Sequence, residues 1–441
     1  MADIKIMKTP AETTIAELFS ASKAALPGDA SAREAAFARF TKAGLPHRRV
    51  EEWKYTDLRA AMREAAPLAP QLSDRAVEKA LSGNDFFAEA NAAKIAIVNG
   101  HVSEGASELG ALPDGVNVVT LSQALAENHP LLASLGAIKG AKSNVAYALN
   151  AAFMTDGVVL HVSPGVEVSR PIHLRFAVDG ESALATATRV LLVVEEGASV
   201  TLLESHESAD GVGHQPNNVV EIIAGDKSRV RHLRIDRHGR EALALSTLTA
   251  HLGAHVAFDS LNLVARPGFT RHQVYMTFAG EHTVGGVRGA TMLNGSQHAD
   301  TTLFVDHIAP HCESRELYKT VLDGEAVGVF QGKIAVAQTA QKTDGKMMSS
   351  AVMLSEGGTM NNKPELEIFA DDVLCAHGAT CGALDDDLLF YLMARGLPRK
   401  EAEALLVESF LGEPIEEALG DDETLHGAFM AVIQDWLAAR S

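Results

Sequence analysis

The chain has 441 residues, of which 46% are hydrophobic, and its 57 Asp and Glu against 38 Lys and Arg give a formal net charge of −19. An acidic surface of this kind repels phosphate backbones and anionic lipids, so neither nucleic acid nor a membrane is an expected partner. The sequence has no apolar run of the length that a signal peptide or a membrane span needs, and three cysteines, an odd number, do not make a disulfide framework. We therefore expect a cytoplasmic globular protein whose thiols stay reduced.

The N-terminal part, residues 1–95, is predicted to be a helical domain. The segment Ser31-Ala-Arg-Glu34 has the pattern of a helix-capping box, and Gly44 is a stop signal for the helix that follows it. A further helix is predicted over residues 48–65. Residues 96–152 are expected to form a mixed α/β connecting region, and short strands are predicted around two places, 95–98 and 116–119.

The central part, residues 153–382, is marked by glycine-led turns at a nearly constant spacing. Successive turns lie 28, 28 and 27 residues apart, each beside a short apolar run. A constant period favours a β-solenoid, because one repeat cannot bury its apolar face alone, whereas a β-sandwich has no reason to keep a period. Beyond Thr283 the period is lost, which predicts a loop or an altered coil. The four turns begin at Gly197, Gly225, Gly253 and Gly280.

The C-terminal part, residues 383–441, is predicted to be helical again. Asp385 is the expected cap of a first helix that ends at Gly396. Two further helices are predicted, over about 399–411 and 423–439. The last one has an apolar stripe, interpreted as core with a partner-docking face as the alternative, made by Leu425, Phe429, Val432, Ile433 and Trp436.

The sequence lacks the common motifs of nucleotide-binding and hydrolytic enzymes. It has no glycine-rich phosphate loop, no dinucleotide-binding glycine pattern, no nucleophile elbow and no His-Glu-x-x-His. We therefore expect no nucleotide to be bound by this chain. If its function consumes ATP or electrons, another polypeptide supplies them.

Cys375 and His377 are the strongest candidate ligands for a metal. The segment Lys363–Gly378 alternates with period two and is predicted to be one strand, whose even positions form the core face. Cys375 and His377 would then share the face turned away from the solenoid interior. A thiolate and an imidazole suit iron or zinc, but two ligands do not close a site, so others must come from elsewhere in the chain or from a second protein. The alternative is a packed cysteine beside a hydrogen-bonded histidine.

A second cluster, His307, His311 and Cys312, has the composition of a metal site. Pro310 prevents a regular helix that would align these side chains, so polar loop residues are the favoured interpretation and a metal site is the alternative. Cys381, six residues beyond Cys375, is a further candidate sulfur ligand or a packing residue.

Several motifs, in the same order along the chain, closely resemble the D subunit of the Suf iron–sulfur cluster assembly machinery. The resemblance spans nearly the whole chain and is densest between about His307 and Leu397. The family usually has an apolar residue where this chain has Cys381, so no ligand role is transferred to that cysteine. The matching motifs are Glu51–Leu58, Ser314–Lys319, Gln341–Lys346, Lys363–Ile368, Asp371–Thr380 and Leu389–Leu397.

The resemblance implies a mainly β fold with a central right-handed parallel β-helix (a β-solenoid), flanked by N-terminal and C-terminal helical domains. It implies a non-catalytic scaffold that pairs with a SufB-like subunit and docks a SufC-like ABC-type ATPase, and it allows a homodimer of the isolated chain. It also implies a transient iron–sulfur cluster or iron at the subunit interface, held at Cys375 and His377. The implied ATPase contact lies within about 385–411, at Asp385, Leu388, Leu389, Tyr391, Leu392 and Arg395.

Two other functions are alternatives. One is the B-type scaffold subunit, which tends to be longer and lacks the Asp-Asp-Val-x-Cys-x-His-Gly run present here at 371–378. The other is a β-helix enzyme acting on polysaccharides, for which Glu365, Glu367 and Asp371 would be the acidic row. Secretion would be expected of such an enzyme, and the sequence does not predict it.

Overall fold

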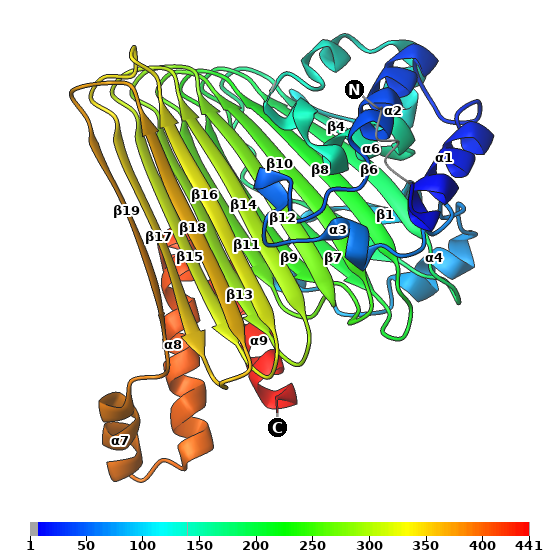
Figure 1. Cartoon of the computed structure of the whole chain (residues 1–441). Helices are drawn as coiled ribbons and strands as arrows, with labels where there is room; N and C mark the ends of the chain where they lie inside the picture. The colour runs from blue at the N-terminus through cyan, green and yellow to red at the C-terminus, as the bar shows by residue number, and fades with distance from the viewer. Residues whose placement is uncertain (1–7, 139, 441) are drawn as a thin grey trace, which may run out of the picture.

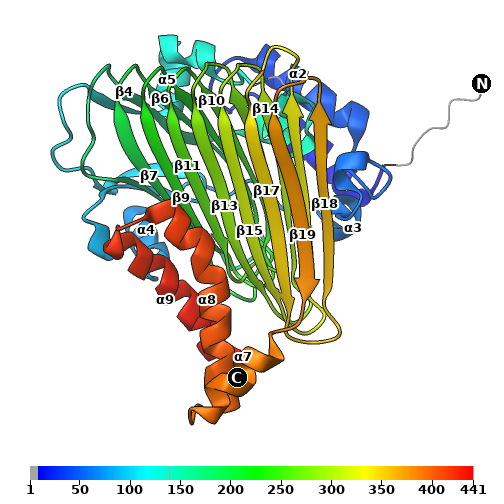
Figure 2. The same ribbon diagram turned by 90° about the vertical axis from the view of Figure 1, so that its left-hand side faces the viewer.

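The computed structural model describes residues 8–138 and 140–440. Its centre is a parallel β-solenoid in which the chain passes back and forth between two facing sheets, with helices at both ends of the chain packed outside them (Figures 1 and 2). The predicted mainly β fold with flanking helical parts is therefore confirmed.

The first sheet contains the odd-numbered strands of the solenoid in the order β19-β17-β15-β13-β11-β9-β7-β5-β1-β2. Its strands are parallel, apart from β2, which pairs antiparallel with β1. The bounds are β1 (Ala93–Val98), β2 (His101–Glu108), β5 (Ile172–Val178), β7 (Ser199–Ser208), β9 (Arg229–Arg237), β11 (Ala257–Val264), β13 (Val284–Leu293), β15 (Glu313–Leu322), β17 (Asp344–Met353) and β19 (Leu374–Gly382).

The second sheet contains the even-numbered strands in the order β18-β16-β14-β12-β10-β8-β6-β4, and β3 joins its far edge antiparallel to β4. The strands expected around 95–98 and 116–119 are confirmed as β1 and β3. The bounds are β3 (Val116–Thr120), β4 (Asp156–Val162), β6 (Ala185–Val194), β8 (Gln215–Ala224), β10 (Leu243–Leu252), β12 (Phe269–Phe278), β14 (His298–His307), β16 (Val327–Val336) and β18 (Thr359–Ile368).

The register of the coils builds one continuous core between the two sheets. Leu248 of β10 pairs with Val220 of β8 on one side and Val274 of β12 on the other, and all three are buried in the same cluster. Because side chains alternate along a strand and parallel strands stack in register, every second residue of each coil falls in this interior. The period-two pattern of the sequence is thus the pattern of a closed, two-layered core.

The four glycine-led turns lie on one edge of the solenoid, between an even strand and the next odd strand. A Cβ at Gly280 would lie 2.1 Å from the backbone nitrogen of Ala254 in the preceding coil, so only glycine allows the two coils to approach there. The loss of period expected beyond Thr283 is wrong, because β12, β14 and β16 begin at residues 269, 298 and 327, a regular spacing of 29 residues. The glycine signal ends there, but the coils continue.

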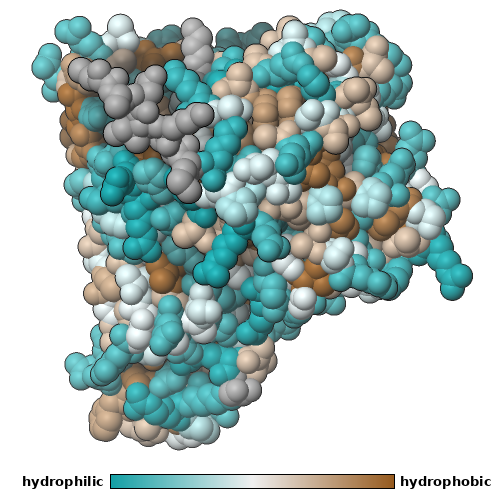
Figure 3. Space-filling model, turned by 45° about the vertical axis from the view of Figure 1, so that its right-hand side comes forward, coloured by the Kyte–Doolittle hydropathy of each residue, from teal (hydrophilic) through white to brown (hydrophobic). Residues whose placement is uncertain are grey.

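Most of the N-terminal helices cover the outer face of the second sheet, whereas α4 (Asp74–Ala80) packs beside β2 at the edge of the first sheet. Their apolar side chains, such as Phe19 and Phe153, pack against outward residues of that sheet such as Leu245. The face seen in Figure 3 shows apolar residues in separate patches among polar ones. The helices are α1 (Pro10–Ser22), α2 (Ala30–Ala43), α3 (Leu58–Ala61), α4 (Asp74–Ala80), α5 (Leu121–Glu127) and α6 (Val145–Phe153).

Two local predictions in this region are wrong. Asp29, rather than Ser31, caps α2 by accepting from the Ser31 backbone at 2.8 Å, although Gly44 ends the helix as expected with φ 70°. The helix predicted over 48–65 is reduced to one 3-10 turn, Glu51–Trp53, and the single turn of α3. The buried Trp53 ring packs instead beneath the guanidinium of Arg271, 3.8 Å from its centroid, and this contact holds the segment to the sheet.

The C-terminal helices cover the outer face of the first sheet. They are α7 (Asp386–Ala394), α8 (Arg399–Leu419) and α9 (Glu423–Ala439), and α7 lies at the far end of α8, away from the sheets (Figures 1 and 2). The apolar stripe of the last helix is buried against outward residues of the first sheet, such as Leu233 and Leu261, so its interpretation as core is confirmed. Helix α8 extends eight residues beyond the predicted end at 411.

The solenoid ends in an open coil made by β18 and β19, which are the edge strands of their sheets (Figure 2). Large apolar side chains are exposed there: Leu374 is 71% exposed, Phe369 67% and Ile368 39%. Ile368 faces the interior, so a continuing coil would cover it. The end of the solenoid therefore presents both unpaired strand edges and apolar surface.

Candidate functional site

Strand β19 positions the two strongest candidate ligands. Cys375 pairs in register with Gly345 of β17, and His377 pairs with Met347. Met347 is buried in the core between the sheets, and paired residues of parallel strands point to the same side, so Cys375 and His377 face the interior of the solenoid. The prediction that they point away from that interior is wrong.

The physical reason is a change of sheet within the segment that was predicted to be one strand. Residues up to Ile368 belong to β18 in the second sheet, a turn follows at 369–373, and Leu374 starts β19 in the first sheet. The turn resets which alternate residues face inward. Cys375 and His377 do share one face, as expected, but it is the inward face of the last coil.

Cys375 is half-buried at this open end. Its side chain packs against the solenoid core together with Val373 and Leu366. Burial raises the pKa of the Cys375 thiol, and the negative charges of Asp344 and Glu316 raise it further, against a lowering by the Gly345 backbone. Because a metal is bound by the thiolate, an arriving cation must displace the thiol proton.

His377 is exposed because no coil follows β19 in the described part of the chain. Its ring is therefore accessible to solvent at the open end of the solenoid, and it lies two residues along the strand from the Cys375 thiol. A thiol and an imidazole so placed can bind one soft or borderline metal ion from the side of the open end.

Glu316 lies behind this pair, and sequence reasoning missed it. It pairs with Met347 of β17, which pairs with His377, so the three residues lie in one register across the first sheet. Glu316 is 1% exposed, neither carboxyl oxygen has a hydrogen-bond partner, and burial raises its pKa to about 8 despite the nearby Ser314 hydroxyl. The sequence shows only an acid in an alternating strand, and the register is what places Glu316 inward.

The pair is an incomplete metal site. Within residues 8–138 and 140–440, no group of three His, Cys, Asp or Glu side chains is arranged to hold a metal ion. Cys381 is exposed on the same inward side of β19, but six residues of strand separate it from Cys375 by about 20 Å. One ion cannot be bound by both sulfurs.

The second predicted cluster, His307, His311 and Cys312, is not brought together in the structure. His307 is buried on the inward face of β14, its Nε2 lies 3.1 Å from the Ser314 hydroxyl, and burial lowers its pKa to about 4. Cys312 is buried with its sulfur 3.2 Å from the Gly280 carbonyl, and burial raises its pKa. His311 is exposed on the turn between them. The three side chains do not form one site.

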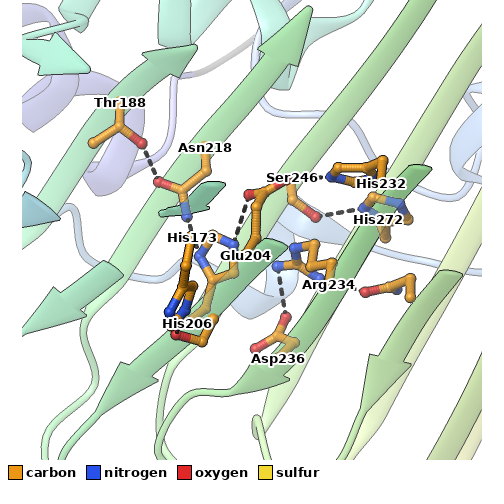
Figure 4. Close-up of polar contacts among 12 residues, drawn as sticks. His173, Thr188, Glu204, His206, Asn218, His232, Arg234, Asp236, Ser246 and His272 are labelled. Atoms are coloured by element: carbon orange, nitrogen blue, oxygen red, sulfur yellow. Dashed lines mark hydrogen bonds and ion pairs between the residues drawn. The ribbon is translucent and has the colours of Figure 1, made fainter. Parts of the chain in front are cut away.

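A polar network inside the middle of the solenoid also brings titratable residues together (Figure 4). Glu204 lies between two imidazoles, with His206 at 2.9 Å on one oxygen and His232 hydrogen-bonded to the other. The chain of contacts continues from His206 to Asn218 at 3.2 Å and from Asn218 to Thr188 at 2.5 Å. These residues come from adjacent coils of both sheets.

The network is electrostatically matched. Burial alone would raise the pKa of Glu204, but the hydrogen bonds from His206 and His232 outweigh it and hold the pKa well below its usual value. Burial would likewise raise the pKa of Asp236, but Arg234, 3.0 Å away, and neighbouring imidazoles hold it at about 2. Because its acids are already partnered within the fold, this network is a structural feature and a weaker site candidate than the open coil.

Helix α7 carries the residues predicted to contact an ATPase. Asp385 caps it as expected, accepting from the backbones of Asp387 and Leu388 at 2.9 and 3.0 Å. Leu388 and Tyr391 are more than half exposed, and Arg395 donates to the Tyr391 hydroxyl at 2.8 Å. Leu389 is buried and Leu392 half-buried, so they support the helix from within.

The exposed apolar surface of α7 also includes two residues that the sequence analysis missed. Phe390 is 73% exposed and Met393 is 40% exposed. Four large apolar side chains exposed on a nine-residue helix form an apolar patch of the kind that marks protein–protein contact sites, so α7 has the character of a docking element.

The fold and the candidate site together define a class: a helix-flanked parallel β-solenoid whose last coil ends in an incomplete thiol–imidazole site. Residues 176–410 match the family described as SUF system FeS cluster assembly, SufBD core domain, and residues 11–174 match the SufBD protein N-terminal region. The chain belongs to the SufBD family and has a role in iron–sulfur cluster assembly.

Individual relatives agree with this assignment. An iron–sulfur cluster assembly SufBD family protein of Synechocystis is 32% identical over 384 residues, which are 85% of this chain and 84% of the relative. The iron–sulfur cluster assembly protein SufD of Escherichia coli is 27% identical over 393 residues, 86% of this chain and 87% of the relative. SufD of Bacillus subtilis is 29% identical over 276 residues, 61% of this chain and 62% of the relative. The resemblance seen in the motifs is thereby confirmed.

Membrane-spanning helices are not a feature of the described ranges, 8–138 and 140–440. Within them, no helix combines the length and the apolar character that crossing a bilayer requires.

Proposed function

We propose that this chain is the D-type scaffold subunit of an iron–sulfur cluster assembly complex, working in the cytoplasm without catalytic activity of its own. Cys375 and His377 contribute half of the ligands for a nascent cluster or iron, and a B-type subunit contributes the rest. The observation that carries this proposal is the pair itself, because both side chains face one accessible mouth and the chain offers no third ligand among its described residues.

The open coil supports pairing with a second β-solenoid. The edges of β18 and β19 have free backbone donors and acceptors, which are templates for further strand pairing. The exposed Phe369 and Leu374 add apolar area beside them. A B-type partner placed there brings its own ligands to Cys375 and His377, and in its absence the same edges suit a second copy of this chain.

Helix α7 supports docking of an ABC-type ATPase, which supplies the ATP hydrolysis that this chain does not perform. Its apolar side chains project from a helix that is anchored through Leu389 and lies away from the sheets (Figure 1). Movement of an ATPase bound there would be transmitted through α8, which packs along β11, β13 and β15 of the first sheet. The terminal coil belongs to the same sheet.

The alternative functions find less support. Of the acidic row considered for polysaccharide cleavage, Glu365 is ion-paired with Lys363 at 3.1 Å and Glu367 with Lys333. Acids neutralised by lysines on an outer face are poor candidates for a general acid and a nucleophile. A B-type assignment is disfavoured by the two relatives named SufD.

The decisive experiment is anaerobic reconstitution of the co-expressed complex with iron and sulfide, followed by absorption and Mössbauer spectroscopy. The variants Cys375→Ala, His377→Ala and their combination should lose most of the cluster signal while the complex still assembles. Cys381→Ala is the matched control, because it removes a thiol from the same side of the same strand. A normal cluster yield from the double variant would overturn the proposal.

Docking of the ATPase is tested separately. Leu388→Ser combined with Tyr391→Ser should weaken co-purification of the ATPase subunit at least tenfold and leave the pairing with the B-type subunit intact. Exposed Leu405 on α8 provides the control, since Leu405→Ser removes an exposed apolar side chain outside α7. Equal loss in both variants would argue against a contact centred on α7.

A further inference from the structure

A column of residues in the left-handed backbone conformation runs along the turn edge of the solenoid. One such residue occurs per coil at equivalent positions, and its N–H donates to a carbonyl of the next coil, as from His255 to Glu281 and from His311 to Gln341, both at 2.9 Å. The column ends at Lys342, in the turn before β17, which donates to Asp372 in the turn before β19 (the upper edge in Figure 2). Its members, with φ between 57° and 70°, are Gly165, Gly197, Lys227, His255, His282, His311 and Lys342.

The fourth, fifth and sixth members are stacked histidines. The rings of His255 and His282 have centroids 5.2 Å apart and planes 9° from parallel, and those of His282 and His311 are 4.7 Å apart and 11° from parallel. These distances follow from the coil spacing of about 4.8 Å. All three side chains are exposed, and none of the rings hydrogen-bonds to another group of the described residues.

The fold does not require imidazoles at these positions. Lys227 and Lys342 occupy the equivalent positions on either side and make the same backbone hydrogen bonds without a ring. Glycine, found in the first two coils of the column, adopts this conformation without the steric cost that other residues bear. Three consecutive histidines in a costly conformation therefore call for another explanation, and residues held this way cluster at functional positions.

The surroundings suit a cation. Lys227 is ion-paired with Glu196 at 2.7 Å, and Lys342 is ion-paired with Asp372, so the flanking ammonium groups are neutralised. The chain as a whole carries a net charge of −19, which raises the local concentration of cations. Neutral imidazole is the commonest protein ligand of first-row transition metals.

We propose that two neighbouring rings of this stack, His282 with either His255 or His311, form a surface site for a divalent first-row transition-metal ion. One nitrogen from each of two neighbouring rings binds the ion, and water completes its coordination. A metal–nitrogen bond is about 2.0–2.1 Å, so two ligating nitrogens lie about 3.3 Å apart in a tetrahedral site. Exposed rings stacked at 4.7 Å reach that separation by tilting toward each other. His282 takes part in either pair, and the inference does not depend on the proposed scaffold function, because it uses other residues.

The test is titration of the full-length chain with Zn²⁺ by calorimetry and with Co²⁺ by visible absorption. Both use a Cys375→Ser, His377→Asn background, so that the terminal pair does not contribute. His282→Asn removes the shared ring, and asparagine tolerates the left-handed conformation, so the turn is preserved. His426→Asn, on α9, is the control for removing one histidine elsewhere.

The expected result is at least a tenfold weaker affinity in His282→Asn and an unchanged affinity in His426→Asn. His255→Asn and His311→Asn should each retain binding, because one stacked pair remains in either variant. Equal affinity of His282→Asn and the control would overturn the proposal, as would the absence of Zn²⁺ binding by the background protein at millimolar metal. Circular dichroism of each variant distinguishes lost binding from lost folding.

Discussion

The middle of the solenoid and its last coil handle polar side chains in opposite ways. In the middle, Glu204 is 1% exposed and each of its oxygens has an imidazole partner supplied by the fold. In the last coil, Cys375 is half-buried and His377 is exposed, and the described chain offers them no further ligand. Both groups lie on inward faces of the first sheet. They differ only in whether another coil covers them.

This difference in coverage distinguishes polar residues that stabilise the fold from polar residues that are free to bind a partner. A buried polar group with its partners removed costs its full desolvation, so the central network must stay complete for the protein to be stable. An exposed pair bears no such cost and can be left unsatisfied. Substitutions in the two regions should therefore have opposite profiles, with large losses of stability in one and losses of cluster binding in the other.

The largest effect is expected from Glu204→Ala. This change leaves His206 and His232 facing an empty, buried position, and breaking a buried charged contact costs about 3–5 kcal/mol. We expect the free energy of unfolding to fall by that amount in urea denaturation followed by circular dichroism. Glu196→Ala, which removes an exposed carboxylate paired with Lys227, should cost less than about 1 kcal/mol. Equal costs would show that the central network does not stabilise the fold.

The next effect is a pH dependence that originates in His238. This residue is 1% exposed, neither ring nitrogen has a partner, and burial lowers its pKa to about 3, helped by Arg234, His206 and His214 and opposed by Asp236. Its unfolded pKa is about 6.5, so below that pH the unfolded chain binds a proton that the folded chain refuses. This contribution to stability is complete above about pH 6.5 and is lost as the pH falls toward 3.

Denaturation at a series of pH values measures this contribution. Between about pH 6 and 4, His238→Gln should make the decline in unfolding free energy shallower by about 1.4 kcal/mol per pH unit, the slope of one proton. Equal slopes for the parent protein and His238→Gln would mean that His238 is protonated in the folded state. His238 would then not be the origin of the pH dependence.

The sequence predicted the architecture better than its local elements. A repeat of 28 residues is visible wherever glycine lies at the close approach between coils, as at Gly253 and Gly280. It disappears beyond Thr283, because the equivalent position, two residues before the left-handed residue of each turn, is then alanine. Ala309 precedes His311 and Ala340 precedes Lys342 in this way. The helix expected over 48–65 failed because Trp53 gains more from packing against Arg271 and the sheet than from a helical turn. Tertiary contacts of that kind leave no periodic signal.

The sequence predicted which residues make up the candidate site, but it did not predict which way their side chains face. The two-residue spacing of Cys375 and His377 placed them on one face of a strand, and they do share a face. The turn at 369–373 decides which face this is, because it changes the set of alternate residues that points inward. The period-two pattern of the sequence continues across this change of sheet and therefore does not reveal it. Glu316 was missed for a related reason: an acid in an alternating strand is assigned to solvent until the register shows that it points inward.

The smallest effect on stability is expected in the last coil. Cys375→Ala combined with His377→Ala removes one half-buried and one exposed side chain, so together they should lower the free energy of unfolding by less than about 1 kcal/mol. Cys312→Ala makes the same chemical change at a cysteine that is 0% exposed, and this single substitution should cost about 1–2 kcal/mol because it leaves a small void in packed core.

Urea denaturation of the isolated chain decides between these expectations. A double variant as stable as the parent, yet unable to support cluster formation in the complex, would separate ligation from folding at the terminal coil. If the double variant instead lost as much stability as Glu204→Ala, Cys375 and His377 would be structural residues like those of the central network. Their exposure at the end of the solenoid would then be no argument for a site completed by a partner.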